Sequence, residues 1–324
     1  MTKRDSASKE QFNEAKMSAL LASTRVIIPA LNAGREWSDT IAAILRNVPA
    51  KNVLVIDSSS IDETAALARN AGFEVIVRPR NEFNHGATRQ LAASLSSGYS
   101  LLVFMTQDAI LQSDTGIMTL VASFDDPEVG AAYGRQLPHA GAKPIEAHAR
   151  LFNYPACSAI RTSESRRQLG FKAIFLSNSF SAYRASALKS VGGFPSNTIF
   201  GEDTITAAKL LNTGWKIAYV SDAQVYHSHS YTWRQEFRRY FDIGVLHARE
   251  HWLLDEFGGT GGEGLRFVRS ELSYLWLKSW WFIPSALIRT ILKFAGYKLG
   301  RMESRLSIPM KRRLSMHRGF WKGH

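Results

Sequence analysis

The stretch Arg25-Val-Ile-Ile-Pro-Ala30 begins a pattern that decides the fold. Two further apolar runs follow it, Asn52-Val-Leu-Val-Ile-Asp57 and Phe73-Glu-Val-Ile-Val77, and helix-like segments at 36–47 and 62–71 separate the three runs. Short β-branched runs of this kind are typical of strands that are buried on both faces. Their alternation with helices predicts an α/β fold, with a Rossmann-like, mostly parallel sheet flanked by helices.

A fourth run, Ser100-Leu-Leu-Val-Phe-Met105, is followed by Thr106-Gln107-Asp108. Ligands of open α/β sheets bind at the carboxyl ends of strands, so Asp57 and Asp108 are expected to face one crevice. The first strand-to-helix turn, Pro29-Ala30-Leu31-Asn32-Ala33-Gly34, lacks the glycine spacing of a dinucleotide loop, which argues against a redox cofactor. Asp57 suits a ribose or pyrimidine ligand, although turn chemistry at a strand end explains it equally well.

The second half of the body gives weaker signals. We expect a helix over 146–169 and a strand over 173–178. The segment Gly201-Glu-Asp-Thr204 opens an amphipathic helix, where acidic side chains also favour the helix dipole. In Val225-Tyr-His-Ser-His229 the two histidines alternate along an extended segment and therefore point to the same side. Each of these features has a structural explanation when it is taken alone.

Charge is distributed unevenly along the 324 residues. The chain has a formal net charge of +12, and residues 265–324 carry thirteen Lys and Arg against two Glu, which is +11 of that total. A nearly neutral body with a basic tail does not suit a nucleic-acid binder.

The single cysteine, Cys157, excludes a disulfide framework and a paired-cysteine zinc site, so any metal is held by oxygen or imidazole. Residues 1–23 are expected to form a flexible leader, because Met1 to Lys16 are polar and lack an apolar core.

Taken in this order, the motifs resemble the family 2 inverting glycosyltransferases of the GT-A fold. The resemblance covers roughly residues 24–232, which divide into a nucleotide-binding half (24–110) and an acceptor-binding half (111–232). Within the family, Phe83-Asn-His-Gly-Ala-Thr-Arg89 and Thr106-Gln-Asp-Ala109 look most like bacterial polysaccharide rhamnosyltransferases. The resemblance implies transfer of L-rhamnose from dTDP-rhamnose onto a lipid-linked or polysaccharide acceptor during synthesis of a surface glycan such as O-antigen.

The resemblance also implies a divalent metal, Mg²⁺ or Mn²⁺, that neutralises the leaving diphosphate. Asp108 is the first expected ligand. The family's Asp-any-Asp motif is present here as Thr106-Gln107-Asp108 without its first acid, so His227, with His229 as its substitute, gains importance.

The remaining roles are carried over in the same way. Asp203 is the expected general base, and Glu202 helps to position the acceptor or the base; a single displacement needs only one base. Arg89 lies near the donor diphosphate or the base. The other expected donor-binding residues are Pro29, Ala30, Asn32, Asp57 and Gln107.

Residues 233–324 are expected to form a helical, basic and aromatic extension. The longest uncharged run of its apolar part, Ser279 to Ile288, has ten residues, against the ~20 that a spanning helix needs. Trp and Tyr beside Lys and Arg suit a helix that lies on an anionic membrane surface. Packing against the body and a homo-oligomer contact are the alternatives.

These features predict a cytoplasmic enzyme that is peripheral on the inner face of the cytoplasmic membrane and binds no nucleic acid. Two alternatives stay open. One is an enzyme of the same fold that uses another donor, a UDP-hexose or GDP-rhamnose. The other is a non-catalytic basic protein that binds a membrane surface or RNA.

Overall fold

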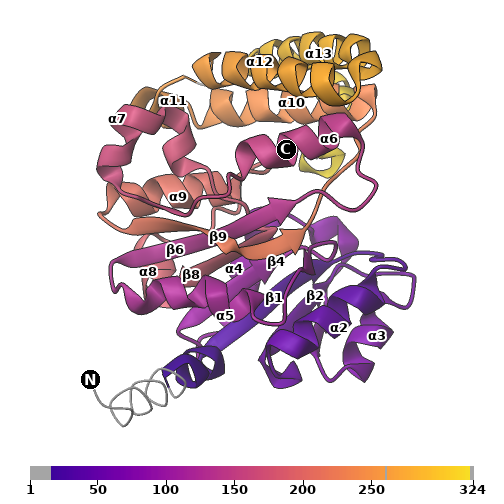
Figure 1. The fold of residues 1–324 in the computed structure, drawn as a ribbon. Helices are drawn as coiled ribbons and strands as arrows, with labels where there is room; N and C mark the ends of the chain where they lie inside the picture. The colour runs from indigo at the N-terminus through magenta and orange to yellow at the C-terminus, as the bar shows by residue number, and fades with distance from the viewer. Residues whose placement is uncertain (1–15, 260, 322–324) are drawn as a thin grey trace.

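The computed structural model describes residues 16–259 and 261–321. One nine-stranded sheet forms its centre, in the order β3-β2-β1-β4-β8-β6-β9-β5, with β7 paired to β9 (Figure 1). The strands are β1 (Thr24–Ala30), β2 (Val53–Asp57), β3 (Glu74–Val77), β4 (Leu101–Met105), β5 (Ile110–Leu111), β6 (Val129–Leu137), β7 (Ala159–Arg161), β8 (Phe180–Arg184) and β9 (Lys216–Tyr226). Strands β1 to β4 pair in parallel, and antiparallel pairing of β4 with β8 joins the two predicted halves in a single sheet.

Helices cover both faces of this sheet and continue beyond it. Residues of α2, α3 and α5 pack in the core on one face, and residues of α4, α8, α9 and α10 pack in the core on the other. The helices are α2 (Trp37–Asn47), α3 (Thr64–Asn70), α4 (His85–Leu95), α5 (Gly116–Val121), α6 (Pro144–Asn153), α7 (Arg166–Leu169), α8 (Ala185–Ser190), α9 (Glu202–Asn212), α10 (Trp233–Arg249), α11 (Trp252–Phe257), α12 (Gly261–Lys278), α13 (Ile283–Arg301) and α14 (Ile308–Leu314). The predicted α/β fold with a helical C-terminal region is confirmed.

The first strand shows why both faces are covered. Ile27 belongs to one core cluster, whereas Val26 and Ile28 belong to the other, and all three are fully buried. Successive strand residues point to opposite faces, so a continuous apolar run needs a helical layer on each side. The polar residues that end these strands are thereby left at one edge of the sheet.

Three expectations about the elements need correction. Residues 16–22 of the predicted leader are helical, and Leu20 and Leu21 pack against the core; residues 1–15 lie outside the described part. The helix predicted over 146–169 ends at Asn153, because Pro155 disfavours a helical conformation of the preceding residue, Tyr154. The strand predicted over 173–178 is absent: residues 170–174 form a 3₁₀ turn, and β8 begins only at Phe180.

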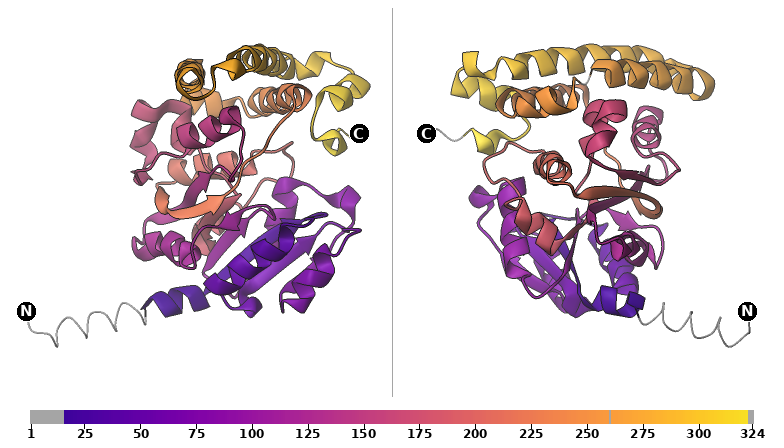
Figure 2. Two further views of the ribbon diagram at one scale, coloured as in Figure 1. Left: turned by 45° about the vertical axis from the view of Figure 1, so that its right-hand side comes forward. Right: turned by 90° about the vertical axis from the view of Figure 1, so that its left-hand side faces the viewer.

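The C-terminal helices are attached to the body by close backbone contact. Helix α13 packs along α10, and a Cβ added at Gly296 or Gly300 would lie 2.4 Å from the Phe237 carbonyl oxygen or 2.0 Å from the Phe241 carbonyl oxygen. Only glycine permits the two helices to approach this closely. Helices α12 and α13 therefore form an outer layer over α10, at the top of Figures 1 and 2. In the described part of the chain, no helix has both the length and the apolar character needed to cross a membrane.

Candidate active site

A cleft of about 810 Å³ opens between the carboxyl ends of β1 and β4 and the C-terminal helices. This is the edge of the sheet where α/β proteins bind their ligands. Nine of the eleven side chains predicted from the sequence line it: Pro29, Ala30, Arg89, Gln107, Asp108, Glu202, Asp203, His227 and His229. Segments that lie far apart in the sequence therefore converge on one site.

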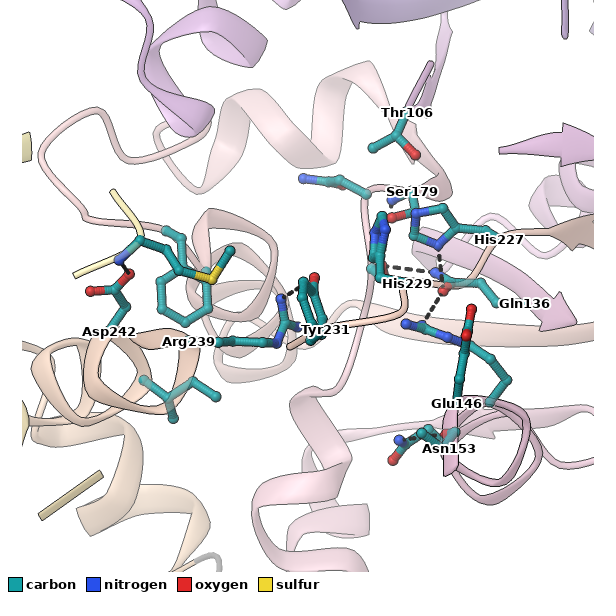
Figure 3. A pocket seen from close by; sticks show the side chains of 18 of the residues that line it. Thr106, Gln136, Glu146, Asn153, Ser179, His227, His229, Tyr231, Arg239 and Asp242 are labelled. Atoms are coloured by element: carbon teal, nitrogen blue, oxygen red, sulfur yellow. Dashed lines mark hydrogen bonds between the residues drawn. The ribbon is translucent and has the colours of Figure 1, made fainter. Parts of the chain in front are cut away.

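A cluster of three side chains lies at one end of the cleft. His227 Nε2 is 3.4 Å from Asp108 Oδ1, and His229 Nδ1 is 3.7 Å from Asp108 Oδ2. One ligand atom from each residue lies within 4.8 Å of the other two. Both histidines come from the segment after β9 and project side by side into the cleft (Figure 3). The sequence prediction that they point to the same side is confirmed.

The protonation states of this cluster suit a metal. Burial alone would raise the pKa of Asp108, but the hydrogen bond and charge of His227, whose ring carries both protons at the acidic pH where this carboxyl titrates, hold the pKa of Asp108 well below its usual value. Burial lowers the pKa of His227 and lowers that of His229 to about 4. At neutral pH the cluster therefore presents a carboxylate and two neutral imidazoles, a donor set that fits a divalent transition-metal ion such as Mn²⁺.

The cleft also contains an acidic pair at the start of α9. Arg89 Nη1 is 2.9 Å from Glu202 Oε1, and both side chains are nearly fully buried. The amide Nδ2 of Asn178 donates to the same Glu202 oxygen at 3.0 Å, and the Asn178 backbone N–H donates to Asp203 Oδ2 at 3.3 Å. These contacts fix both carboxyl groups against the cleft wall.

The pair has opposite pKa shifts. Burial and the charge of Glu202 raise the pKa of Asp203 to about 7. Burial would also raise the pKa of Glu202, but the charge of Arg89 lowers it. A carboxylate with a pKa near the working pH is suited to accept a proton, so Asp203 has the properties of a general base.

The expected donor-binding residues fall into two groups. Pro29, Ala30 and Gln107 line the cleft, and the Gln107 amide accepts from the Leu31 N–H at 2.7 Å and donates to the Leu31 carbonyl at 3.1 Å. An aspartate at this position would lack the donor for the second bond. The glutamine thus joins the loops that follow β1 and β4.

Asn32 and Asp57 are not brought into the cleft lining. Asp57 Oδ2 accepts from the Ser60 N–H at 3.0 Å and Oδ1 accepts from the Ser60 hydroxyl at 2.5 Å, while Asn32 Oδ1 accepts from the Ile61 N–H at 2.9 Å. Both side chains brace the loops after β1 and β2, which is the turn chemistry left open for Asp57. The donor-binding role of these two residues stays a prediction.

The cleft lining also contains residues that the sequence did not identify, among them Gln136, Asn178, His85 and His317. His317 comes from the C-terminal tail and lies edge-on to His85, with ring centroids 5.1 Å apart. Gln136 and Asn178 follow no recognisable motif, and their roles depend on which side chains meet them. Only the Phe83–Arg89 motif, which contains His85, carried a usable signal.

The chain matches known proteins over most of its length. The family model described as Glycosyltransferase like family 2 matches residues 22–241. The O-antigen chain rhamnosyltransferase RfbN of Salmonella typhimurium is 44% identical over 298 residues, which cover 91% of this chain and 95% of that protein. The O-antigen chain rhamnosyltransferase WbaN of Salmonella anatum is 43% identical over 304 residues, which cover 93% and 96%.

A solved structure supports the fold. The mannosyltransferase PcManGT from Pyrobaculum calidifontis, in complex with GDP-Man and Mn²⁺, superposes with a TM-score of 0.55 at 18% identity and covers 90% of this chain and 84% of that chain.

Proposed function

Because the chain belongs to the Glycosyltransferase like family 2, we propose that it transfers L-rhamnose from dTDP-rhamnose, with inversion, onto a lipid-linked or polysaccharide acceptor of bacterial surface-glycan synthesis. The observation that carries this proposal is the single cleft in which the Asp108–His227–His229 cluster and Asp203 both lie. The two O-antigen rhamnosyltransferases similar to the chain over nearly its full length support rhamnose as the sugar. Family membership favours the enzyme over a non-catalytic membrane- or RNA-binding protein.

The cleft residues account for the chemistry. Asp108, His227 and His229 would hold the divalent ion, which neutralises the leaving diphosphate when it is bound. Asp203 accepts the proton of the acceptor hydroxyl while that oxygen attacks the anomeric carbon and the bond to the nucleotide breaks. The proton ends on the Asp203 carboxyl group. Inversion follows because a single displacement occurs on the face opposite the nucleotide.

Glu202 and Arg89 act on the base. The negative charge of Glu202 contributes to the raised pKa of Asp203. The ion pair with Arg89 keeps Glu202 ionised inside the wall of the cleft. Together they give Asp203 a proton affinity suited to neutral pH.

A donor panel tests the proposal. Hydrolysis and transfer are measured with dTDP-rhamnose, GDP-rhamnose, UDP-glucose and UDP-galactose, each with Mn²⁺ and with Mg²⁺. We expect turnover with dTDP-rhamnose and its loss in the Asp203→Asn variant. Turnover with another donor alone would replace the sugar assignment and leave the transferase assignment in place.

We further propose that the outer face of α12 and α13 rests on an anionic membrane surface at the cytoplasmic side. Six apolar side chains of α12, α13 and the 3₁₀ turn between them are at least 61% exposed: Trp276, Leu277, Trp280, Trp281, Ile291 and Phe294. Lys278 and Lys298 are exposed among them. Exposed aromatic and aliphatic residues next to lysines are typical of helices that lie among lipid headgroups.

The position of the cleft supports this surface. Phe282 and Ser285, which adjoin the exposed tryptophans, also line the cleft. An acceptor carried on a polyprenyl diphosphate in the membrane would therefore lie near the cleft when this face is in contact with lipid. The inner face of α13 is already covered by α10, so packing against the body explains only half of the helix surface.

Sedimentation with vesicles tests the membrane contact. Wild-type protein should sediment with vesicles that contain phosphatidylglycerol, and the double variant Trp280→Ser/Trp281→Ser should sediment less. Ile61→Ser is the matched control, because Ile61 is 92% exposed in the loop after β2. Vesicle binding that is unchanged in the double variant, together with loss of a dimer in light scattering, would assign the face to a second copy of the chain.

A further inference from the structure

Gln136 lies directly behind His227 on the neighbouring strand. β6 pairs in parallel with β9, and Gln136 stands opposite Val225, two residues before His227. Residues two apart on a strand share a face, so both side chains project from the same side of the sheet. Gln136 is 2% exposed and His227 is 4% exposed. Figure 3 shows the two side chains in contact.

The hydrogen bonds of Gln136 define its orientation. Its Oε1 accepts from Arg150 Nη1 at 2.6 Å and lies 2.9 Å from His227 Nδ1, while its Nε2 donates to Ser177 Oγ at 3.0 Å. A guanidinium can only donate hydrogen bonds, so the amide atom that faces Arg150 must be the oxygen. A reversed amide would bring two donors together.

This orientation decides the proton position on His227. Since Gln136 Oε1 accepts, His227 Nδ1 must carry a hydrogen and donate it. The lone pair of the neutral ring is then on Nε2, the atom 3.4 Å from Asp108 Oδ1. Two acceptor atoms thus face each other in the cleft, as a shared cation requires.

We propose that Gln136, held by Arg150, is a positioning residue of the metal site: it fixes the His227 tautomer and ring orientation that leave Nε2 free to bind the ion. This inference rests on the proposed function only in taking Asp108 and His227 as metal ligands. Buried partners of a ligating histidine raise its affinity for metal in this way, and their loss costs about 10–100-fold in metal affinity.

Titration calorimetry of Mn²⁺ into the nucleotide-free protein tests the role. We expect Gln136→Leu to weaken Mn²⁺ binding about 10–100-fold. Gln136→Glu should keep the affinity, because a carboxylate accepts from both Arg150 and His227. Ser177→Ala is the matched control, since it removes the partner of Gln136 Nε2 but keeps the contacts of Gln136 Oε1 with Arg150 and His227, and it should leave the affinity unchanged.

The Asp108→Asn variant distinguishes failure of the proposed Gln136 role from failure of the metal site. If Asp108→Asn weakens Mn²⁺ binding and Gln136→Leu does not, the role of Gln136 is overturned and the metal site stands. If Asp108→Asn has no effect, the metal site itself is overturned.

A second measurement reads the proton position on His227 in the wild-type protein. Long-range ¹H–¹⁵N correlation spectra of the metal-free, histidine-labelled protein at pH 8 report which ring nitrogen is protonated. We expect the Nδ1–H tautomer for His227, assigned by comparison with His227→Gln. An Nε2–H tautomer would overturn the proposal.

Discussion

The cleft contains two groups of side chains, one around Asp108 and one around Asp203. Their surroundings shift the pKa values of the two carboxyl groups in opposite directions. Asp108 faces His227 and His229, and its pKa is lowered well below the usual value. Asp203 lies beside the charge of Glu202 in a buried wall, and its pKa is raised to about 7. Burial alone would raise the pKa of both carboxyl groups, so the difference between their pKa values comes from the neighbouring side chains.

This contrast assigns the chemistry. A carboxylate that stays ionised at every working pH is suited to hold a cation, and one that titrates near neutral pH is suited to exchange a proton. Under the proposed function, the same residue type would serve two functions in one cleft. Each prediction that follows alters one of these two groups of side chains and leaves the other unchanged.

The largest expected effect is on turnover. Asp203→Asn removes the proton acceptor and should lower the transfer rate about 10²–10⁴-fold. The binding of nucleotide sugar, measured by calorimetry, should be unchanged, because the Asp108–His227–His229 cluster is intact. A variant that keeps wild-type turnover would remove Asp203 from the mechanism.

The next effect is on stability. Arg89→Met leaves the buried carboxylate of Glu202 without its cation and should lower the free energy of unfolding by about 3–5 kcal/mol. Arg78→Met is the control, since the Arg78–Glu82 pair is about half exposed and should contribute no more than ~1 kcal/mol. Urea denaturation of the two variants measures the difference, and equal losses would contradict the assigned importance of burial.

In the metal-binding cluster, Asp108→Asn should weaken Mn²⁺ binding strongly. The loss should exceed the roughly 10–100-fold that follows removal of a residue that only hydrogen-bonds to a metal ligand. The unfolding midpoint should change little, because the Asp108 side chain is only partly buried. Calorimetry and thermal unfolding of the same sample test both statements. A fall in stability with unchanged affinity for Mn²⁺ would mean that Asp108 has a structural role and is not a metal ligand.

The smallest effect is a shift of the pH profile. Since Asp203 must be ionised to accept a proton, kcat/KM should rise with pH through about 7. Glu202→Gln removes a negative neighbour and leaves Arg89 as an unpaired cation, so the rise should move to lower pH. A profile that stays in place would mean that another group titrates.

Much of the site could be predicted from the sequence. Asp108, Asp203 and His227 follow recognisable strand ends or helix starts, and such positions converge whenever the fold is correct. The four early strands were also predictable, because buried strands need long apolar runs. Asn32 and Asp57 show the limit: a polar residue at a strand end can turn to the ligand or to its own loop, and the local sequence is compatible with both.

The C-terminal region shows the same limit on a larger scale. The glycines at 296 and 300 were visible in the sequence, but their partner helix, α10, was not. Likewise, a basic, aromatic segment is compatible with lipid contact and with protein contact. The structure shows that α13 is covered by α10 on one side and exposed on the other.

Local patterns in the sequence were sufficient to predict the α/β fold, its first four strands and the residue types available for metal binding and proton transfer, because hydrophobic period and turn chemistry are local. Only the tertiary structure decided that Gln136 orients His227, that Asn178 holds the two acids and that the pKa of Asp203 lies near 7. The physical reason is that burial, charge and hydrogen-bond direction at each site are set by side chains from distant segments.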